Sequence, residues 1–275
     1  MADRPLQTLA SPDQPVEQCR GIFLHQVAAA IEALEESKPN VHSARKQLKR
    51  ARATLRLLRR ATGDDSYRRE NVAARDAARP LSRARDDEMI SNSLAGLLDH
   101  FGRNVPRMNF AQHGQKLSAA QIDGIKAALG RSMKRAQEWE LDADGWDCIT
   151  TGLRATYRRA RRALRHARTD RATEDLHEWR KQTKYLWHQL QILTPLAPGP
   201  IGELADEFHH LADYLGNEHD LAVLRERAAA SSELHPLIDR RREELQDKAL
   251  TLGERLYSEK SRPFVHRLER HWSDT

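Results

Sequence analysis

The sequence predicts an all-α protein, and two observations carry that prediction. Apolar residues recur three and four positions apart, as at Leu186, Leu190 and Leu193, which is the period of one buried helix face. No run of residues alternates apolar and polar side chains with the β-branched enrichment that a strand needs. Helix breakers then divide the chain into about ten helices. The expected breaks are Pro39–Asn40, Gly63–Asp64, Pro80, Gly102 to Pro106, Pro195 to Pro200, Gly216 and Pro236.

Two helix starts carry capping signals. Ser118 and Gln121 have the spacing of a capping box, in which each side chain accepts a hydrogen bond from the backbone N–H of the other residue. Thr173 is a candidate N-cap for the long helix that follows it. Residues 102–117 mix Gly, Pro, Asn and Gln, so we expect this stretch to be a linker or a lid.

Length and composition set further bounds. The chain has 275 residues, with 46 Lys and Arg against 40 Asp and Glu, so its formal charge is only +6. Cys19 and Cys148 are too few and too far apart for a disulfide scaffold or a cysteine-based zinc site. No stretch reaches the roughly 18 apolar residues of a membrane span, and the first residues lack the apolar core of a signal peptide. We therefore expect a cytoplasmic protein with no membrane span.

One motif occurs twice in the chain. The segments 41–49 and 176–184 share His, Arg, Lys, Gln and Lys at corresponding positions. The offset between them is 135 residues, the separation of His42 from His177. Repetition at a fixed offset is typical of a duplicated structural unit.

A weaker match supports the same duplication. At an offset of 134 residues, the segments 81–86 and 215–220 both begin with Leu and end with Asp. Because the two matches come in the same order, we expect two helical repeats, at about residues 10–135 and 140–270.

Basic residues follow one face of each repeated helix. Positions i, i+3, i+4 and i+7 of a helix share a face, so each motif forms a stripe of cations. The first stripe, with Arg50 beside it, is His42, Arg45, Lys46, Lys49, Arg52 and Arg56. The second stripe is His177, Arg180, Lys181, Lys184 and His188. A third basic face, on the helix before the second motif, holds Arg154, Arg158, Arg161, Arg162 and Arg165.

The modest net charge hides a segregated pattern. Residues 41–60 contain eight Lys and Arg and no acid, and residues 152–168 also contain no acid. A solvated helix face normally intersperses both signs of charge. Basic helices without acids therefore indicate an anionic partner, and the doubled motif favours this interpretation over a solvated surface.

The chain resembles the CHAD family, which is named for a conserved histidine α-helical domain. The resemblance rests on the two His-x-x-Arg-Lys-x-x-Lys motifs, the Arg-rich helix at 152–168 and the Leu-Gly-Asn-Glu-His-Asp segment at 215–220. It implies a single domain over residues 10–270, in which two pseudo-symmetric helical bundles enclose a basic channel or groove. It also implies non-catalytic binding of inorganic polyphosphate in that channel, and association with polyphosphate granules.

The stripes and the resemblance together predict how a linear anion binds. We expect the two His-led helices to face each other, so that their cations form a lane for a chain of phosphates. Arginine would supply bidentate hydrogen bonds, and lysine a compact charge. His42 and His177 would act either as neutral donors or as cations, and protonation on binding predicts tighter binding at mildly acid pH. The family pattern is broken at Ser82, which replaces a glycine, and at His219, which replaces an arginine.

Other interpretations stay open at this point. A nucleic-acid or general polyanion-binding protein is the main alternative, but aromatic residues make up only 5% and none interleaves with the first basic helix. An enzyme acting on phosphate is less favoured, because the chain has no Gly-rich phosphate loop and no dense carboxylate cluster for magnesium. We therefore expect no catalysis, no cofactor and no metal. A metal site could be assembled only from scattered residues, namely His209, His210, Asp213, His219 and Asp220.

Overall fold

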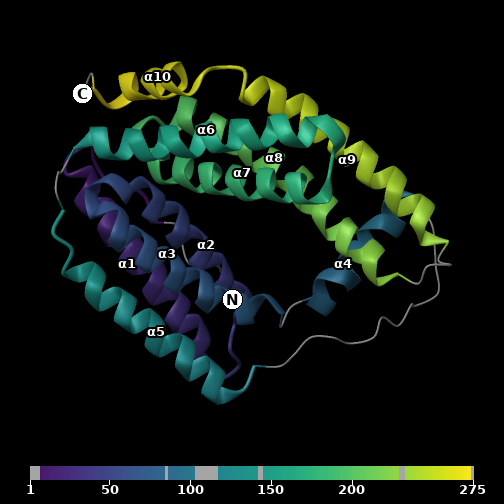
Figure 1. The fold of residues 1–275 in the computed structure, drawn as a ribbon, viewed down its shortest axis with the longest axis horizontal. Helices are drawn as coiled ribbons and strands as arrows, with labels where there is room; N and C mark the ends of the chain where they lie inside the picture. The colour runs from purple at the N-terminus through teal and green to yellow at the C-terminus, as the bar shows by residue number, and fades with distance from the viewer. Residues whose placement is uncertain (1–6, 84–85, 103–116, 142–144, 229–232, 274–275) are drawn as a thin grey trace.

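The structure, a computed structural model, is all-α as the sequence predicts. The residues that it describes are 7–83, 86–102, 117–141, 145–228 and 233–273. Within these ranges no residue lies in a strand, and no helix is both long and apolar enough to cross a membrane. The described helices (Figure 1) are α1 (Pro15–Glu35), α2 (Val41–Leu57), α3 (Arg59–Arg83), α4 (Asp86–His100), α5 (Ala119–Gln137), α6 (Trp146–Asp170), α7 (Thr173–Leu193), the 3₁₀ turn η1 (Thr194–Leu196), α8 (Pro198–Arg227), α9 (Leu234–Leu256) and α10 (Ser261–Ser273).

Each half of the chain builds a bundle with the same order of neighbours. In the first half, α1 packs on α2, α2 packs on α3, and α5 returns to α1. In the second half, α6 packs on α7, α7 packs on α8, and α10 returns to α6. Figure 1 shows the first bundle at lower left and the second along the top. This order is what two repeats at 10–135 and 140–270 would give, and the duplication itself stays a prediction from the sequence.

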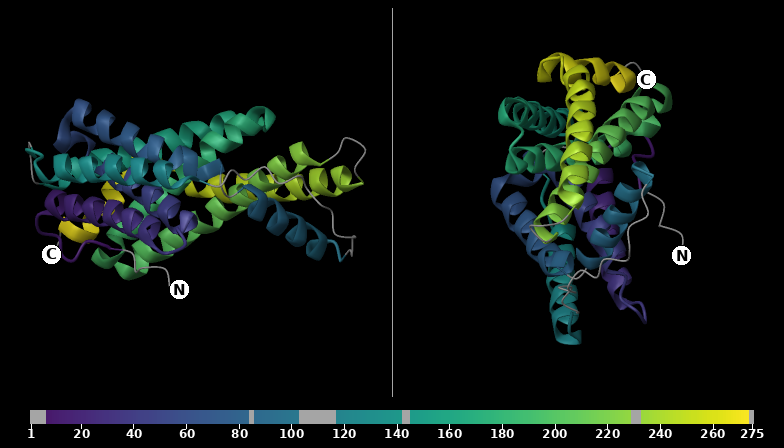
Figure 2. Two further views of the ribbon diagram at one scale, coloured as in Figure 1. Left: turned by 90° about the horizontal axis from the view of Figure 1, so that it is seen from below. Right: turned by 90° about the vertical axis from the view of Figure 1, so that its right-hand side faces the viewer.

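One helix of the first half leaves its own bundle. α4 packs against α8 and α9, at the end of the molecule that extends away from the rest (Figure 2). This contact has an apolar core of its own. The buried residues of that core are Ile90, Leu97, Leu221, Leu224, Leu234, Ile238 and Leu245. Because α4 packs on helices of the second half, the two halves are interlocked.

The bundles meet where α2 contacts α6 and α7. A Cβ on Gly152 of α6 would lie 2.5 Å from the carbonyl oxygen of Arg56, so glycine is required for α6 to come this close to α2. Gln189 of α7 is buried at the same junction. Its Nε2 donates to the carbonyl oxygen of Ala53 and to Oγ1 of Thr156, each at 3.1 Å. The main apolar core is continuous across this junction, and it fixes α2 relative to α7.

Local signals in the sequence correctly mark several helix ends and bends. Ser118 and Gln121 form the expected capping box at the start of α5. Asn40 caps α2, because its Oδ1 accepts a hydrogen bond of 3.0 Å from a backbone N–H of the first turn. Gly63 produces a kink within α3, with a φ of 73°. The expected linker or lid at 102–117 lies almost entirely outside the described residues.

Three local predictions are wrong. Pro80 lies within α3, and Gly216 lies within α8, so neither residue ends a helix. Thr173 is the first residue of α7, and the cap position is Ala172, which makes no side-chain capping bond. Gly216 is buried inside α8 beside the side chain of Arg180. Tertiary contacts thus override a local breaker signal there.

Candidate anion-binding site

A cavity lies where α2, α7 and α8 face one another, and we refer to it as the basic pocket. Its volume is about 480 Å³, and α3 and α4 contribute Ser82 and Met89 to its wall. Six of the lining side chains are Lys or Arg. Asp220 is the one acid among the lining residues that the structure describes. The described wall therefore holds six cations and one acid, and one of the cations, Lys181, is paired with Glu178 outside the wall.

Both His-led stripes contribute to this wall. The two motif helices are direct neighbours in the fold, as expected from the sequence. The predicted site residues that line the basic pocket are Arg45, Lys49 and Arg52 from α2, and His177, Arg180, Lys181, Lys184 and His188 from α7. The fold thus brings together side chains that are about half a chain apart in the sequence.

Four predicted residues of α2 are placed elsewhere. His42 and Lys46 belong to the first two turns of the helix and do not belong to the described pocket wall. Arg50 and Arg56 are buried, with 7% and 8% of their surface exposed. The Cζ atom of Arg56 lies 3.6 Å from the ring centroid of Tyr185, so this arginine packs between α2 and α7.

The predicted arginines of α6 also lie outside the basic pocket. Arg154 lines a separate cavity beside α10, and Arg161 and Arg165 line a hollow beside the end of α9. Arg158 and Arg162 are exposed on the same helix. The third basic face of the sequence is therefore a surface distinct from the pocket that the two motif helices share.

Arg180 is held in the pocket wall between α7 and α8. Its side chain is 18% exposed, and its Nη2 lies 4.0 Å from Oδ1 of Asp220. It passes close to Gly216, where a Cβ would lie 3.8 Å from Nε of Arg180, an ordinary contact distance. That Nε is buried and has no hydrogen-bond partner among the described residues. Burial lowers the pKa of Arg180 and Asp220 opposes this shift, but a guanidinium stays charged in proteins.

Lys184 lies one turn further along the same face of α7. Burial lowers the pKa of its ammonium group to about 8, and the positive charge of Arg180 adds to that shift. Asp213 and Asp220 act in the opposite direction without offsetting the burial. Within the described part of the chain, Lys184 has no ion-pair partner. A bound anion would supply the missing negative charge.

Three histidines line the pocket, and two of them are in ring contact. The ring centroids of His177 and His219 are 4.8 Å apart. Burial and then the charge of Arg180 lower the pKa of both, to about 4 for His219. His188 differs, because it is fully buried with a pKa of about 3 and its Nδ1 is 3.0 Å from Oε1 of Gln191. His188 therefore fills the wall as a neutral residue, whereas the other two lie where an added negative charge would raise their pKa values.

Several residues of the pocket wall lie outside the two His-led motifs. His219 and Asp220 belong to the second copy of the weaker repeat, so that repeat is the signal that identifies them as site residues. Ser82 belongs to the first copy of that repeat, at the position that matches Gly216, and it also lines the cavity. Tyr185 and Met89 carry no such signal, because their place in the wall depends on how the helices pack.

The metal site that could be assembled from the sequence is not formed. Nε2 of His209 lies 3.5 Å from Oδ2 of Asp213, which is a pair within one helix. In the described ranges, no group of three His, Cys, Asp or Glu side chains is placed to hold a metal ion. His219 and Asp220 lie in the wall of the basic pocket instead.

The family comparison agrees with this geometry. A family model described as CHAD domain matches residues 20–229. The chain belongs to the CHAD domain family. The resemblance read from the doubled motif is thereby confirmed, and the matched range of this CHAD domain includes every helix that lines the basic pocket. The match ends before α9, so α9 and α10 lie beyond it. No curated protein sequence matches the chain.

Proposed function

We propose that this CHAD domain binds inorganic polyphosphate in the basic pocket and performs no chemistry on it. The observation that carries the proposal is the convergence of the two His-led helices on one cavity. Arg180 and Lys184 are largely buried in its wall, where a positive charge is unfavourable unless a negative charge compensates it. An anion is therefore the ligand class that this cavity favours.

A linear polyphosphate suits the composition of the wall. Guanidinium groups form paired hydrogen bonds with phosphoryl oxygens, and lysine supplies a compact charge to the same chain. Each further phosphate adds a contact and releases condensed counterions. We therefore expect affinity to rise with chain length and to fall with salt concentration.

The proposed lack of catalysis rests on the residue types. The sequence contains no Gly-rich phosphate loop and no dense carboxylate cluster that would hold magnesium. Asp220, the acid in the described wall, faces Arg180 at 4.0 Å. An acid that is paired with an arginine is suited to position that cation and is poorly suited to accept a proton.

Nucleic acid is the alternative ligand, and the pocket favours it less. Single-stranded nucleic acid is usually held by open aromatic rings on which bases stack. Tyr185, the aromatic residue of the described wall apart from histidine, is only 4% exposed. Its ring carries Arg52 and Arg56, at 5.7 and 3.6 Å from its centroid, so it is not available to a base. A general polyanion surface is tested together with nucleic acid below.

The proposal extends to location in the cell. A protein that binds long polyphosphate chains gains avidity wherever those chains are concentrated. We therefore propose that this CHAD domain associates with polyphosphate granules. Fluorescence microscopy of the tagged protein, with a granule stain, tests this extension separately from the binding itself.

Calorimetric titration with tripolyphosphate and with long-chain polyphosphate tests the proposed function. The variant Arg180→Ala/Lys184→Ala removes two pocket cations, and Arg131→Ala/Lys134→Ala removes two exposed cations of α5 as a matched control. Because charged hydrogen bonds contribute about 1.5–3 kcal/mol each, we expect the pocket variant to bind at least about tenfold more weakly. We expect the control to stay within about twofold. A folded pocket variant that binds as tightly as the parent chain would contradict the proposal.

A further inference from the structure

The outer face of α6 carries a row of arginines that the basic pocket does not use. Arg154, Arg158, Arg162 and Arg165 are exposed there. With a rise of about 1.5 Å per residue, the row spans roughly 16 Å along the helix. The apolar side of α6 is buried in the core, so the arginines do not contribute to packing there.

These arginines are not neutralised by the described part of the chain. None of the four side chains forms an ion pair or a hydrogen bond with a described residue. The acids near them have other partners: Asp147 pairs with Arg60, and Glu254 lies 3.2 Å from Arg168. Like charges one turn apart destabilise a helix, and this row has no internal compensation among the described residues.

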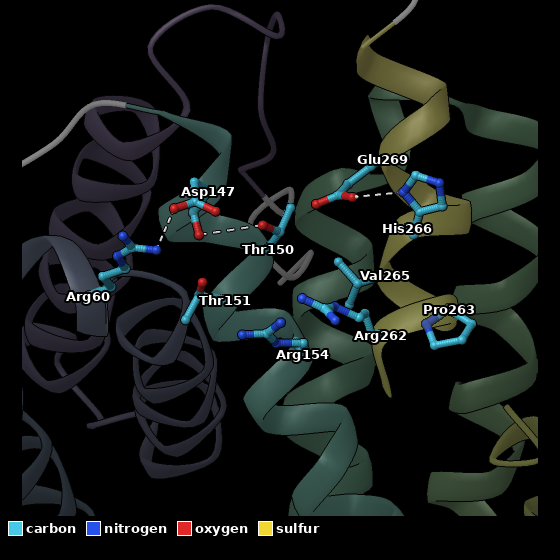
Figure 3. A pocket seen from close by; sticks show the side chains of 10 residues that line it. All are labelled: Arg60, Asp147, Thr150, Thr151, Arg154, Arg262, Pro263, Val265, His266 and Glu269. Atoms are coloured by element: carbon cyan, nitrogen blue, oxygen red, sulfur yellow. Dashed lines mark hydrogen bonds and ion pairs between the residues drawn. The ribbon is translucent and has the colours of Figure 1, made fainter. Parts of the chain in front are cut away.

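A hollow lies at each end of the row. At one end, α6 and α10 enclose a cavity of about 520 Å³, and Arg262 of α10 reaches into it beside Arg154 (Figure 3). Both acids of that cavity are engaged, Asp147 with Arg60 and Glu269 with His266, the latter at 3.5 Å. The two guanidinium groups at this end thus share a cavity without sharing an acid.

The hollow at the other end of the row is also lined by cations. Arg161 and Arg165 line a hollow of about 340 Å³ together with Tyr257. Nε of Arg161 donates to the carbonyl oxygen of Tyr257 at 2.9 Å, which fixes the arginine at the edge of that hollow. The exposed row therefore runs from one cation-lined hollow to another, along a single helix.

We propose that this face of α6 is a second polyphosphate-binding surface, distinct from the basic pocket. This inference rests on the proposed function, because it assigns the same ligand class to a second site. The exposed arginines follow a single helix, and no Phe, Tyr or Trp lies at the exposed positions of α6, which suits a linear chain of phosphates better than stacked bases. With two separated surfaces, a long chain can engage more cations than the pocket offers, whereas a short chain has no such gain.

The two surfaces differ in burial, and this difference makes them separable. Arg180 and Lys184 of the pocket are largely buried and hold a short anion closely, whereas the α6 arginines are exposed and act mainly through counterion release. Loss of the α6 surface should therefore affect long chains and leave tripolyphosphate unchanged. Loss of the pocket should affect both ligands.

Charge reversal on α6 provides the test. Arg158→Glu/Arg162→Glu is compared with Arg131→Glu/Lys134→Glu, which makes the same charge change on exposed positions of α5. Binding of tripolyphosphate, long-chain polyphosphate and duplex DNA is measured across a series of salt concentrations. For the α6 variant we expect at least about tenfold weaker binding of long chains, a smaller salt slope and unchanged tripolyphosphate affinity.

Each other outcome counts against the proposal. Long-chain binding equal to that of the parent, or an equal loss in the α5 control, would show that α6 is not a specific surface. A loss confined to duplex DNA would assign the face to nucleic acid. A different result would contradict the proposed function, namely that Arg180→Ala/Lys184→Ala still binds tripolyphosphate as tightly as the parent chain.

Discussion

The guanidinium carbon of Arg56 lies 3.6 Å from the ring centroid of Tyr185, and this cation–π contact joins α2 to α7. Arg56 is 8% exposed, and it also donates to the carbonyl oxygen of Arg52. The sequence pattern places Arg56 in a ligand-binding stripe, whereas its surroundings give it a packing role. The junction between the two halves thus contains a buried cation whose role is packing and which need not contact a ligand.

We expect Arg56→Ala to destabilise the fold by about 1–3 kcal/mol, because it removes a buried cation–π contact and a packed side chain. Urea denaturation followed by circular dichroism measures the change. Arg45→Ala, in the pocket wall, is the matched control and should change stability less while weakening polyphosphate binding. If Arg56→Ala keeps full stability but loses binding, Arg56 contacts the ligand.

Lys184 should show a conflict between stability and binding. Its pKa in the folded protein, about 8, lies below the usual value of 10.5, so folding disfavours the charged form. Lys184→Met should therefore raise the free energy of unfolding by about 1–2 kcal/mol at pH 7, with weaker polyphosphate binding. The gain should be complete below pH 8 and should fade as the pH approaches 10. A variant that is less stable than the parent at pH 7 would contradict this account.

The same lysine sets the alkaline limit of binding. A bound phosphate raises the pKa of Lys184 above about 8, so binding takes up a proton when the free protein has lost it. Polyphosphate affinity should therefore fall as pH rises from 8 to 10. Titrations in buffers of different ionisation enthalpy measure the proton uptake, and Lys184→Arg should remove this part of the pH dependence.

His177 and His219 should strengthen binding on the acid side. Burial lowers the pKa of both, so they are neutral at pH 7 until phosphate oxygens approach and raise their pKa values. Affinity should rise between pH 8 and pH 6, and His177→Asn/His219→Asn should flatten this profile. Equal affinity of the parent chain at the two pH values would mean that the histidines are structural.

Gly216 tests the position of Arg180 without removing a charge. A Cβ at Gly216 would lie 3.8 Å from Nε of Arg180, an ordinary contact distance. Gly216→Ala should therefore bind normally and gain about 0.5–1 kcal/mol of stability from its better helix propensity. Gly216→Leu should displace the guanidinium and weaken binding by about tenfold at least, with helix content unchanged. Normal binding by Gly216→Leu would show that the position of Arg180 is not critical.

The sequence predicts the helical class and the pairing of the motif helices, because both depend on patterns that a single chain displays. The 3.6-residue period reveals the helices, and the doubled motif links His42 to His177. Helix ends are predicted where a side chain makes its own cap, as at Ser118. They are missed where packing decides, as at Gly216, which the sequence marks as a breaker but which is buried inside α8 beside Arg180.

The candidate site is predicted in part for the same reason. Helical spacing identifies which cations share a face, and it correctly groups Arg180 with Lys184. It does not reveal which face is buried, so Arg56 is grouped with the pocket residues although it packs on Tyr185. It also merges the arginines of α6 with the pocket, although in the fold Arg154, Arg161 and Arg165 line other cavities, beside α10 and the end of α9.

The most direct test of the central claim is a competition titration at about 150 mM salt, near physiological ionic strength. Labelled long-chain polyphosphate is bound to the protein and displaced with unlabelled polyphosphate, tripolyphosphate or duplex DNA. The predicted result is displacement by polyphosphate that strengthens with chain length, little displacement by DNA, and at least about tenfold weaker binding in Arg180→Ala/Lys184→Ala. Equal displacement by DNA, or a pocket variant that binds as well as the parent, would contradict a polyphosphate site in the basic pocket.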